Sequence, residues 1–136
     1  MKDGGLKSFQ QRMKAIPRES VKAIEPALLK SAYEMQDMME DLVPEDTGDL
    51  KGSITVTGPG RSTPAYSQPG GSHTVPSNGV AVTAGNTDVR YAHIVEYGST
   101  RTDAKPFFWP SYRLLKKRSA NRIKNAISKA IREARK

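Results

Sequence analysis

The stretch VPEDTGDLKGSITVT, residues 43–57, decides the fold of this chain because it ends one helix and starts one strand. Val43 stands before a proline, and a residue in that position avoids the α-helical region, so the preceding helix must end there. In the polar turn that follows, we expect Thr47 to cap a short helical turn over residues 48–52. Residues 53–57 then alternate between polar and apolar side chains, which predicts a strand.

Upstream, apolar side chains recur at steps of three and four residues, which predicts helical structure over residues 6–43. The longer stripe comprises Val21, Ile24, Leu28, Ala32, Met35, Met38, Met39 and Leu42, and the shorter one comprises Leu6, Phe9, Met13 and Ile16. Pro17 separates the two stripes, and at Pro26 we expect a kink or a fresh helix start, because proline lacks an amide donor. We interpret the methionine-rich stripe as core, with an adaptable partner-binding face as the alternative.

Downstream, residues 80–84 predict a second strand. The loop between the strands, residues 58–79, contains five glycines and four prolines. A loop of this length without secondary structure is uncommon in a compact domain and usually has a function or lacks order. We therefore expect residues 58–79 to form an arm that becomes ordered against a neighbouring subunit, within a strand–loop–strand unit over residues 53–84.

The last third of the chain contains two further elements. Residues 91–98 fit a short helix that ends at Gly98 or a strand, because their apolar positions suit both periods, and we favour the helix. After an aromatic run, residues 107–136 predict one long helix with an apolar face and cations over the rest of its surface. We treat residues 1–136 as a single domain.

Composition limits the class of protein. The chain has 136 residues, enough for one domain, and 36% hydrophobic residues, enough to exclude wholesale disorder. It has no cysteine, which excludes disulfides and thiolate chemistry. No apolar run approaches the roughly 18 residues of a membrane span, and no signal peptide is visible. The net charge is +8, and residues 111–136, with ten Lys and Arg against one Glu, carry +9, so the rest of the chain is nearly neutral.

Asp46-Thr47-Gly48 spells the triplet of the aspartic proteases, whose two carboxylates must share a dry site. The neighbouring Glu45 and Asp49 add negative charge, and no apolar strand precedes the triplet. We therefore interpret it as a capping turn.

His93 and Glu96 are three residues apart, a spacing at which two metal ligands share one face of a helix. A zinc site needs three or four ligands, and the only other histidine is His73 in the long loop. An ion pair of Glu96 with Arg90 or Arg101 is the simpler interpretation. We predict no catalytic residue, metal or cofactor, and therefore no enzyme.

Three segments, taken in order, resemble the gp-ten-like family of small neck and tail-completion proteins of tailed bacteriophages. Residues 44–54, PEDTGDLKGSI, resemble its P-x-D-T-G-x-L-x-x-S-I segment; residues 91–99, YAHIVEYGS, resemble Y-A-x-x-V-E-F-G-T; and residues 106–111, PFFWPS, resemble P-F-L-x-P-A. The order and spacing agree with the family over roughly residues 20–135. The long loop at 58–79 departs from the pattern.

The resemblance implies a structural protein of the virion, located at the head–tail junction and in the host cytoplasm during assembly. Such proteins form closed rings of six or twelve copies, which join the neck to the tail and let double-stranded DNA pass. The implied partners are further copies of the chain, head-closure or adaptor proteins, tail-terminator or tail-tube proteins, and DNA without sequence preference, with no membrane. The implied fold is α+β, a small antiparallel sheet flanked by a long N-terminal and a long basic C-terminal helix.

Candidate residues follow from these segments and from the basic helix. We expect structural or subunit-interface roles for Thr47, Gly48 and Leu50 at the turn into the first strand, for Tyr91, Ala92, Glu96 and Gly98 in the middle segment, and for Phe107, Phe108 and Trp109 as the anchor of the last helix. Contact with DNA or with a protein partner is expected of Arg61, Lys116, Lys117, Arg118, Arg122 and Lys124. The alternative function is a basic protein that binds double-stranded DNA through its C-terminal helix.

Overall fold

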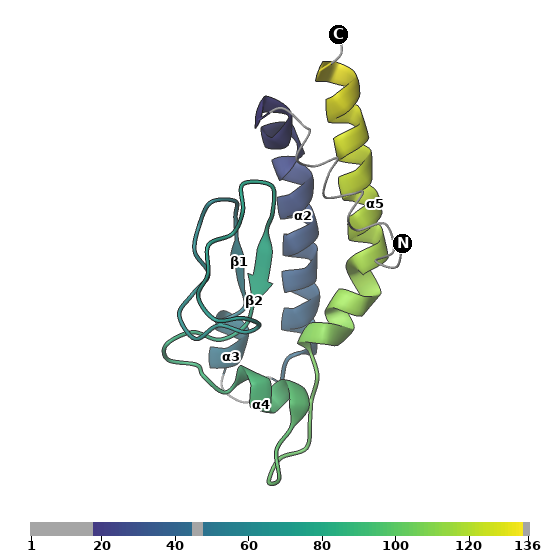
Figure 1. Ribbon diagram of the computed structural model, residues 1–136. Helices are drawn as coiled ribbons and strands as arrows, with labels where there is room; N and C mark the ends of the chain where they lie inside the picture. Colours follow the sequence, from purple (N-terminus) through teal and green to yellow (C-terminus); the bar gives the residue numbers. More distant parts are fainter. Residues whose placement is uncertain (1–17, 45–47, 135–136) are drawn as a thin grey trace, which may run out of the picture.

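The computed structural model describes residues 18–44 and 48–134 (Figure 1), so the expected helix over residues 6–16 and the expected cap at Thr47 lie outside the described residues. The helices are α2 (Arg18–Leu42), α3 (Asp49–Gly52), α4 (Ala92–Tyr97) and α5 (Phe108–Ala134), and the strands are β1 (Thr55–Thr57) and β2 (Ala81–Thr83). Two long helices and a small antiparallel sheet confirm the predicted α+β fold class.

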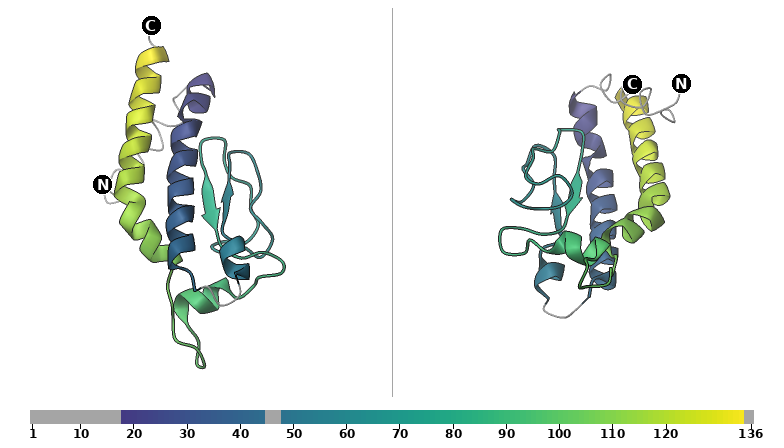
Figure 2. Two further views of the ribbon diagram at one scale, coloured as in Figure 1. Left: turned by 180° about the vertical axis from the view of Figure 1, so that it is seen from behind. Right: turned by 60° about the horizontal axis from the view of Figure 1, so that its bottom comes forward.

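The sheet, α2 and α5 lie side by side, with α2 in the middle (Figures 1 and 2). Helix α2 packs along α5 on one side and against both strands on the other. The short helices α3 and α4 lie together at one end of this arrangement, where the chain crosses from the sheet to α5 (Figure 1). Among the described residues, none of the helices has the length and apolar character needed to cross a bilayer.

Helix α2 runs without interruption through Pro26, so the expected fresh helix start at that residue was wrong. Pro26 lies on the exposed side of the helix, whereas Ile24 and Leu28 on either side of it are buried. The burial of these neighbours holds the helix together across the one hydrogen bond that proline cannot donate. The helix ends at Leu42, immediately before Val43 and Pro44, as the sequence predicts.

Strands β1 and β2 are three residues each and pair in antiparallel register, with Val56 opposite Val82. A two-stranded sheet of this size is marginal in water, so it depends on α2 for its stability. Met35 and Val82 pack against the same buried cluster, and the Gln36 side-chain amide donates to the Ile54 carbonyl oxygen at 2.8 Å. These contacts fix the sheet to the middle of α2.

The loop over residues 58–79 is ordered within its own chain. The Thr63 amide donates to the His73 carbonyl oxygen at 2.8 Å, and the Val75 amide donates to the Arg61 carbonyl oxygen at 2.8 Å. Thr63 and Ser67 are buried. The prediction that this loop needs a neighbouring subunit to become ordered was therefore wrong, because hydrogen bonds across the loop satisfy its backbone in place of an outside partner.

Most of the buried apolar residues that the structure describes belong to two clusters. The larger one lies where α2, the sheet, α4 and the start of α5 meet, and contains Met39, Val43, Leu50, Ile54, Ala84, Val89, Ala92, Phe107 and Phe108. The smaller one lies between α2 and α5 and contains Ile24, Ile127 and Ala130. The larger cluster therefore holds the sheet, α2, α4 and the start of α5 together.

Candidate functional site

The joint between α4 and α5 is built on one carboxylate. Glu96 is buried, and its two oxygens accept hydrogen bonds from the backbone amides of Phe107, Phe108 and Trp109 at 2.9, 2.8 and 3.1 Å. The first amides of a helix have no partner within the helix, and the helix dipole places positive potential there. A charged acceptor from α4 therefore fixes both the start and the direction of α5.

The expected ion pair of Glu96 with Arg90 or Arg101 was wrong. The carboxylate instead accepts from the amides of Phe107, Phe108 and Trp109, and the bonds to the first two are buried away from water. The Arg90 guanidinium instead lies 3.8 Å from the centre of the Tyr66 ring, and its Nε donates to the Thr87 carbonyl oxygen at 3.0 Å.

Gly98 lets the chain turn back toward Glu96. Its φ is +77°, and a Cβ at this position would lie 2.8 Å from the Ala104 amide nitrogen and 3.0 Å from the Thr102 carbonyl oxygen. The Lys105 amide then donates to the Val95 carbonyl oxygen at 2.8 Å, which closes the loop. Within the segment 91–98, Tyr91 occupies the N-cap of α4 and Ala92 is buried.

The turn into β1 is built from the first segment. Gly48, with φ +77°, occupies the N-cap of α3 where we expected Thr47, and Leu50 is buried in the larger cluster. The Ser53 hydroxyl donates to the Leu50 carbonyl oxygen at 2.6 Å and accepts from the Gly85 amide at 3.0 Å. Ser53 thus ties the start of β1 to the end of β2, a role that the sequence reasoning did not assign.

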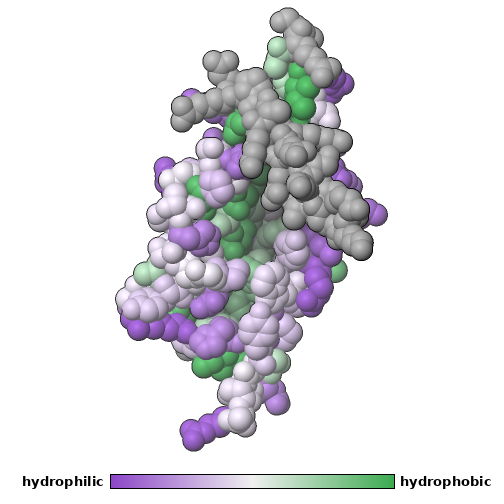
Figure 3. Space-filling view, in the orientation of Figure 1, coloured by the Kyte–Doolittle hydropathy of each residue, from purple (hydrophilic) through white to green (hydrophobic). Residues whose placement is uncertain are grey.

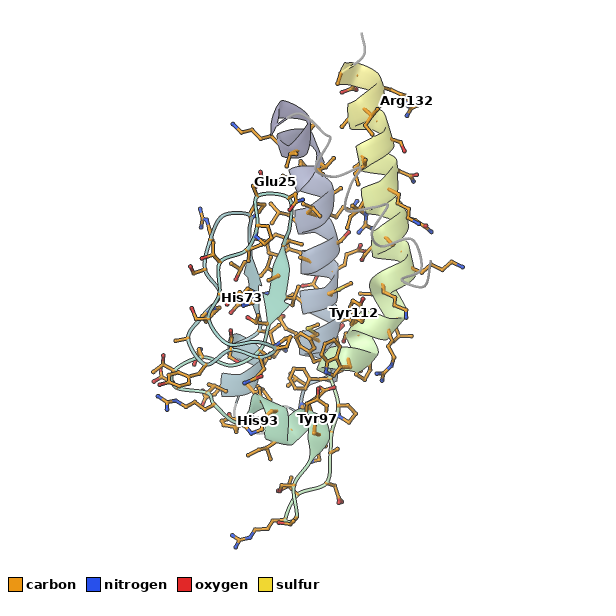
Figure 4. The ribbon with its side chains drawn as sticks, viewed as in Figure 1. Glu25, His73, His93, Tyr97, Tyr112 and Arg132 are labelled. Carbon is orange, nitrogen blue, oxygen red and sulfur yellow. The ribbon has the colours of Figure 1, made fainter. Side chains whose placement is uncertain are left out.

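An aromatic series runs from the core to the surface at the start of α5. Phe107, Phe108, Trp109 and Tyr112 follow one another edge to face, with ring centres 6.4, 5.0 and 5.9 Å apart. The Trp109 indole N–H donates to the Tyr97 hydroxyl at 2.6 Å. Tyr97 is 67% exposed and Tyr112 is 43% exposed (Figure 4), and we call Tyr97, Trp109 and Tyr112 the aromatic surface.

The aromatic surface borders an apolar groove of about 360 Å³ between β2, α2 and α5. Figure 3 shows hydrophobic residues gathered along this hollow, with hydrophilic residues on either side. The lining is mostly aliphatic and aromatic and includes Ala32, Met35, Met39, Val82, Trp109 and Ile123. The methionine-rich stripe of α2 is therefore partly core, through buried Met39, and partly a surface that faces the groove.

The basic candidates divide into two groups. Arg122 and Arg118 both form ion pairs with Glu34 on α2, the latter at 3.2 Å, and Arg122 also donates to the Ser31 hydroxyl. Hydrogen bonding from Arg122, together with the charges of both arginines, lowers the pKa of Glu34 below 4.5. These two arginines therefore join α5 to α2.

The other basic candidates are exposed and have no ion pair among the described residues. Lys116, Lys117 and Lys124 lie along α5, and Arg61 lies on the long loop. The structure thus brings three of the six basic candidates onto one open helix surface. The two histidines lie on separate elements, His73 on the loop and His93 on α4 (Figure 4).

A family model described as "Bacteriophage HK97-gp10, putative tail-component" matches residues 7–98. The matched range contains the turn into β1 and the segment that carries Glu96, and it ends before the aromatic surface reaches α5. No curated protein and no solved structure matches the chain.

Proposed function

The chain belongs to the HK97-gp10-like family of bacteriophage tail components, and from this premise we propose that it forms a ring at the head–tail junction of the virion. A tail component is a structural protein that works in the virion by contact with other virion proteins. The finer role proposed here is to join the neck to the tail and to surround the passage of double-stranded DNA. This role requires no catalytic residue, metal or cofactor.

The observation that carries the proposal is the apolar surface that a single copy leaves uncovered. The aromatic surface and the groove adjoin each other, and both are lined by side chains that water solvates poorly. Tyr97 at the end of α4, and Tyr112 and Leu114 in the first turns of α5, are exposed near the joint that Glu96 fixes. A rigid joint with an apolar surface beside it suits a heterologous contact that repeats from copy to copy and closes into a ring.

We propose six or twelve copies per ring, stacked between head-closure or adaptor proteins on one side and tail-terminator or tail-tube proteins on the other. Two surfaces support a stacked arrangement. The polar loop 99–105 projects from the end of the molecule at α4 (Figure 1), and the long helices extend toward the opposite end. A ring built from such subunits has distinct surfaces for the proteins above and below it.

The test is the mass of the full-length protein in solution, measured by light scattering after size exclusion, alone and with the adjoining ring protein. A defined oligomer, visible as a ring by electron microscopy, is the expected result. A particle that stays monomeric under both conditions would contradict the proposal.

The second candidate function, direct binding of double-stranded DNA, is favoured by the exposed cations of α5. Lys116, Lys117 and Lys124 are free to contact phosphates, whereas Arg118 and Arg122 are engaged by Glu34. Binding of this kind weakens steeply between about 50 and 200 mM salt, because counterions are released. Fluorescence anisotropy of labelled double-stranded DNA tests it with three proteins: the wild type, the double variant Lys117→Glu/Lys124→Glu and the control Lys22→Glu. Equal binding by all three proteins would exclude α5 as the contact.

A further inference from the structure

One wall of the groove is formed by β2 and the residue before it. Four consecutive residues, 80–83, line the groove, so β2 runs along it. The Gly85 amide points toward β1, where it donates to Ser53, so Thr83 and Ala81 face β1 as well. The amide and carbonyl of Ala84 pair with Gln68 on the opposite edge. By the same alternation, the amide and carbonyl of Val82 point to the same edge of β2 as those of Ala84, and no strand pairs with Val82 there among the described residues.

The remaining walls are apolar. Ala32, Met35 and Met39 come from α2, and Trp109, Tyr112 and Ile123 come from α5. Thr83, whose hydroxyl has no hydrogen-bond partner among the described residues, also lines the groove. A groove of about 360 Å³ is in the size range of sites that hold a ligand, and its methionines adapt their shape to an incoming side chain. Long apolar grooves between helices typically accept an amphipathic helix.

We propose that residues 6–16 of a neighbouring copy bind in this groove. The inference rests on the self-assembly proposed above and names the contact that links one copy to the next. Leu6, Phe9, Met13 and Ile16 recur at steps of three and four residues, which aligns four apolar side chains on one face of a helix. The residues between them are polar or charged, so the other face of the segment suits solvent.

The reach of the segment favours a neighbouring copy over the same chain. A helix over residues 6–16 is about 16 Å long. Pro17 separates it from α2, which begins at Arg18, so a helix of this length that turned back at Pro17 would cover only about 16 Å of its own α2. Ser31, where the groove begins on α2, is thirteen residues beyond Arg18, or about 20 Å, and Met39 is about 32 Å away. A helix of about 16 Å is therefore shorter than the distance to the groove of its own chain, whereas the segment of an adjacent copy can approach the groove from outside.

Thiol crosslinking tests this contact directly, because the chain contains no cysteine. Two single-cysteine variants of the full-length protein, Phe9→Cys and Tyr112→Cys, are mixed and treated with a short bismaleimide. Only a link between different chains joins these two positions in the mixture. Gln11→Cys, on the opposite face of the segment, and Lys117→Cys, on the exposed side of α5, are the matched controls.

The expected result is a crosslinked dimer of Phe9→Cys with Tyr112→Cys, at least tenfold more abundant than any dimer that includes a control variant. Oligomers that give no such dimer would overturn this inference and leave the ring proposal standing. A link formed only within one chain, seen in the double variant Phe9→Cys/Tyr112→Cys, would overturn it in favour of intramolecular docking. Monomers under all conditions would overturn the ring proposal, and this inference with it.

Trp109 gives a second readout, since it is the only tryptophan and it lines the groove. Phe9→Ser is expected to move the fluorescence emission of Trp109 to longer wavelength in the assembled protein, because water then fills the groove. Gln11→Ser is expected to leave the emission unchanged. Identical spectra for wild type, Phe9→Ser and Gln11→Ser would contradict occupation of the groove by this segment.

Discussion

At the scale of single residues, Glu96 is the side chain on which the start of α5 depends. One buried carboxylate satisfies three backbone amides and so determines where α5 begins and which way it points. A neutral replacement keeps part of the geometry, whereas a truncation leaves three donors without a partner inside the protein. The stability of the chain should therefore depend on this side chain more than on any exposed carboxylate.

We predict that Glu96→Ala lowers the free energy of unfolding by about 3 kcal/mol and that Glu96→Gln lowers it by about 1–2 kcal/mol. The alanine variant loses every acceptor, while glutamine keeps one oxygen and loses the charge. Urea denaturation followed by circular dichroism measures both. Glu133→Gln, exposed near the end of α5, is the control and should change stability by less than about 0.5 kcal/mol. Equal stability of Glu96→Ala and wild type would show that the cap contributes nothing.

Gly98 offers a second prediction at this scale, with Gly60 as a matched control. Both glycines have φ +77°, but a Cβ at Gly98 meets backbone atoms at 2.8 and 3.0 Å, whereas a Cβ at Gly60 has no described atom within 4 Å. Gly60→Ala should cost about 1 kcal/mol, the price of a left-handed alanine. Gly98→Ala should cost at least about 2 kcal/mol more, because the loop must also shift. Thermal unfolding compares the two, and similar losses would refute the steric argument.

At the scale of elements, the packing of α2 on α5 combines apolar burial with one polar link. Ile24, Ile127 and Ala130 are buried between the helices, and Glu34 joins Arg118 and Arg122 farther along. These groups are partly exposed to water, so their attraction is weakened and contributes modestly. The ion pairs nevertheless favour one register of α2 against α5, because Arg118 and Arg122, one helical turn apart on α5, both contact Glu34.

The ion pair predicts a dependence of stability on pH. The folded pKa of Glu34 is lowered, so its contribution is fully present above the unfolded value of 4.5 and is lost as the pH falls through the folded value. At pH 7, Glu34→Gln should be less stable than wild type by up to about 1 kcal/mol. The difference should disappear well below pH 4.5. Urea titrations of both proteins at several pH values measure it, with Glu40→Gln as control, and a difference that is constant with pH would contradict the assignment.

At the scale of the whole molecule, folding and assembly use different surfaces. The aromatic surface is largely outside the core, since Tyr97 is mostly exposed and its hydroxyl only receives the Trp109 N–H. Substitutions there should affect contacts between molecules more than the stability of one molecule. This separation makes the proposed ring testable without unfolding the protein.

We predict that Tyr97→Ala changes the free energy of unfolding by less than about 1 kcal/mol but reduces the oligomeric fraction several-fold. Tyr33→Ala, a similarly exposed tyrosine on α2, is the control and should leave the oligomeric fraction unchanged. Analytical ultracentrifugation at several concentrations measures both. Loss of assembly in the control alone would move the interface from α5 to α2.

The sequence was most informative where structure is local. Pro44 marks the end of α2, and the alternation over residues 53–57 marks β1, because each signal acts within a few residues. The partners of Glu96 lie more than ten residues ahead in the chain, so no local period indicates them. The prediction for the loop at 58–79 was wrong for the same reason. Its glycines and prolines predict a lack of helix and strand, but its order comes from pairing Arg61 with Val75 and Thr63 with His73.

The two buried clusters differ in size, so we expect the end of the molecule at the sheet and α4 to be more stable than the opposite end of α2 and α5. Among the residues that the structure describes, the cluster around the sheet and α4 contains nine buried side chains, and the cluster between the far ends of α2 and α5 contains three. Transient openings of the backbone require little free energy where few side chains are buried. Hydrogen–deuterium exchange should accordingly advance inward along both helices from Val21 and Ile131, while the amides of Phe107 and Phe108 stay protected longest. A subunit whose local stability falls along its length can keep the sheet end rigid while the far ends of α2 and α5 adapt to a neighbouring protein.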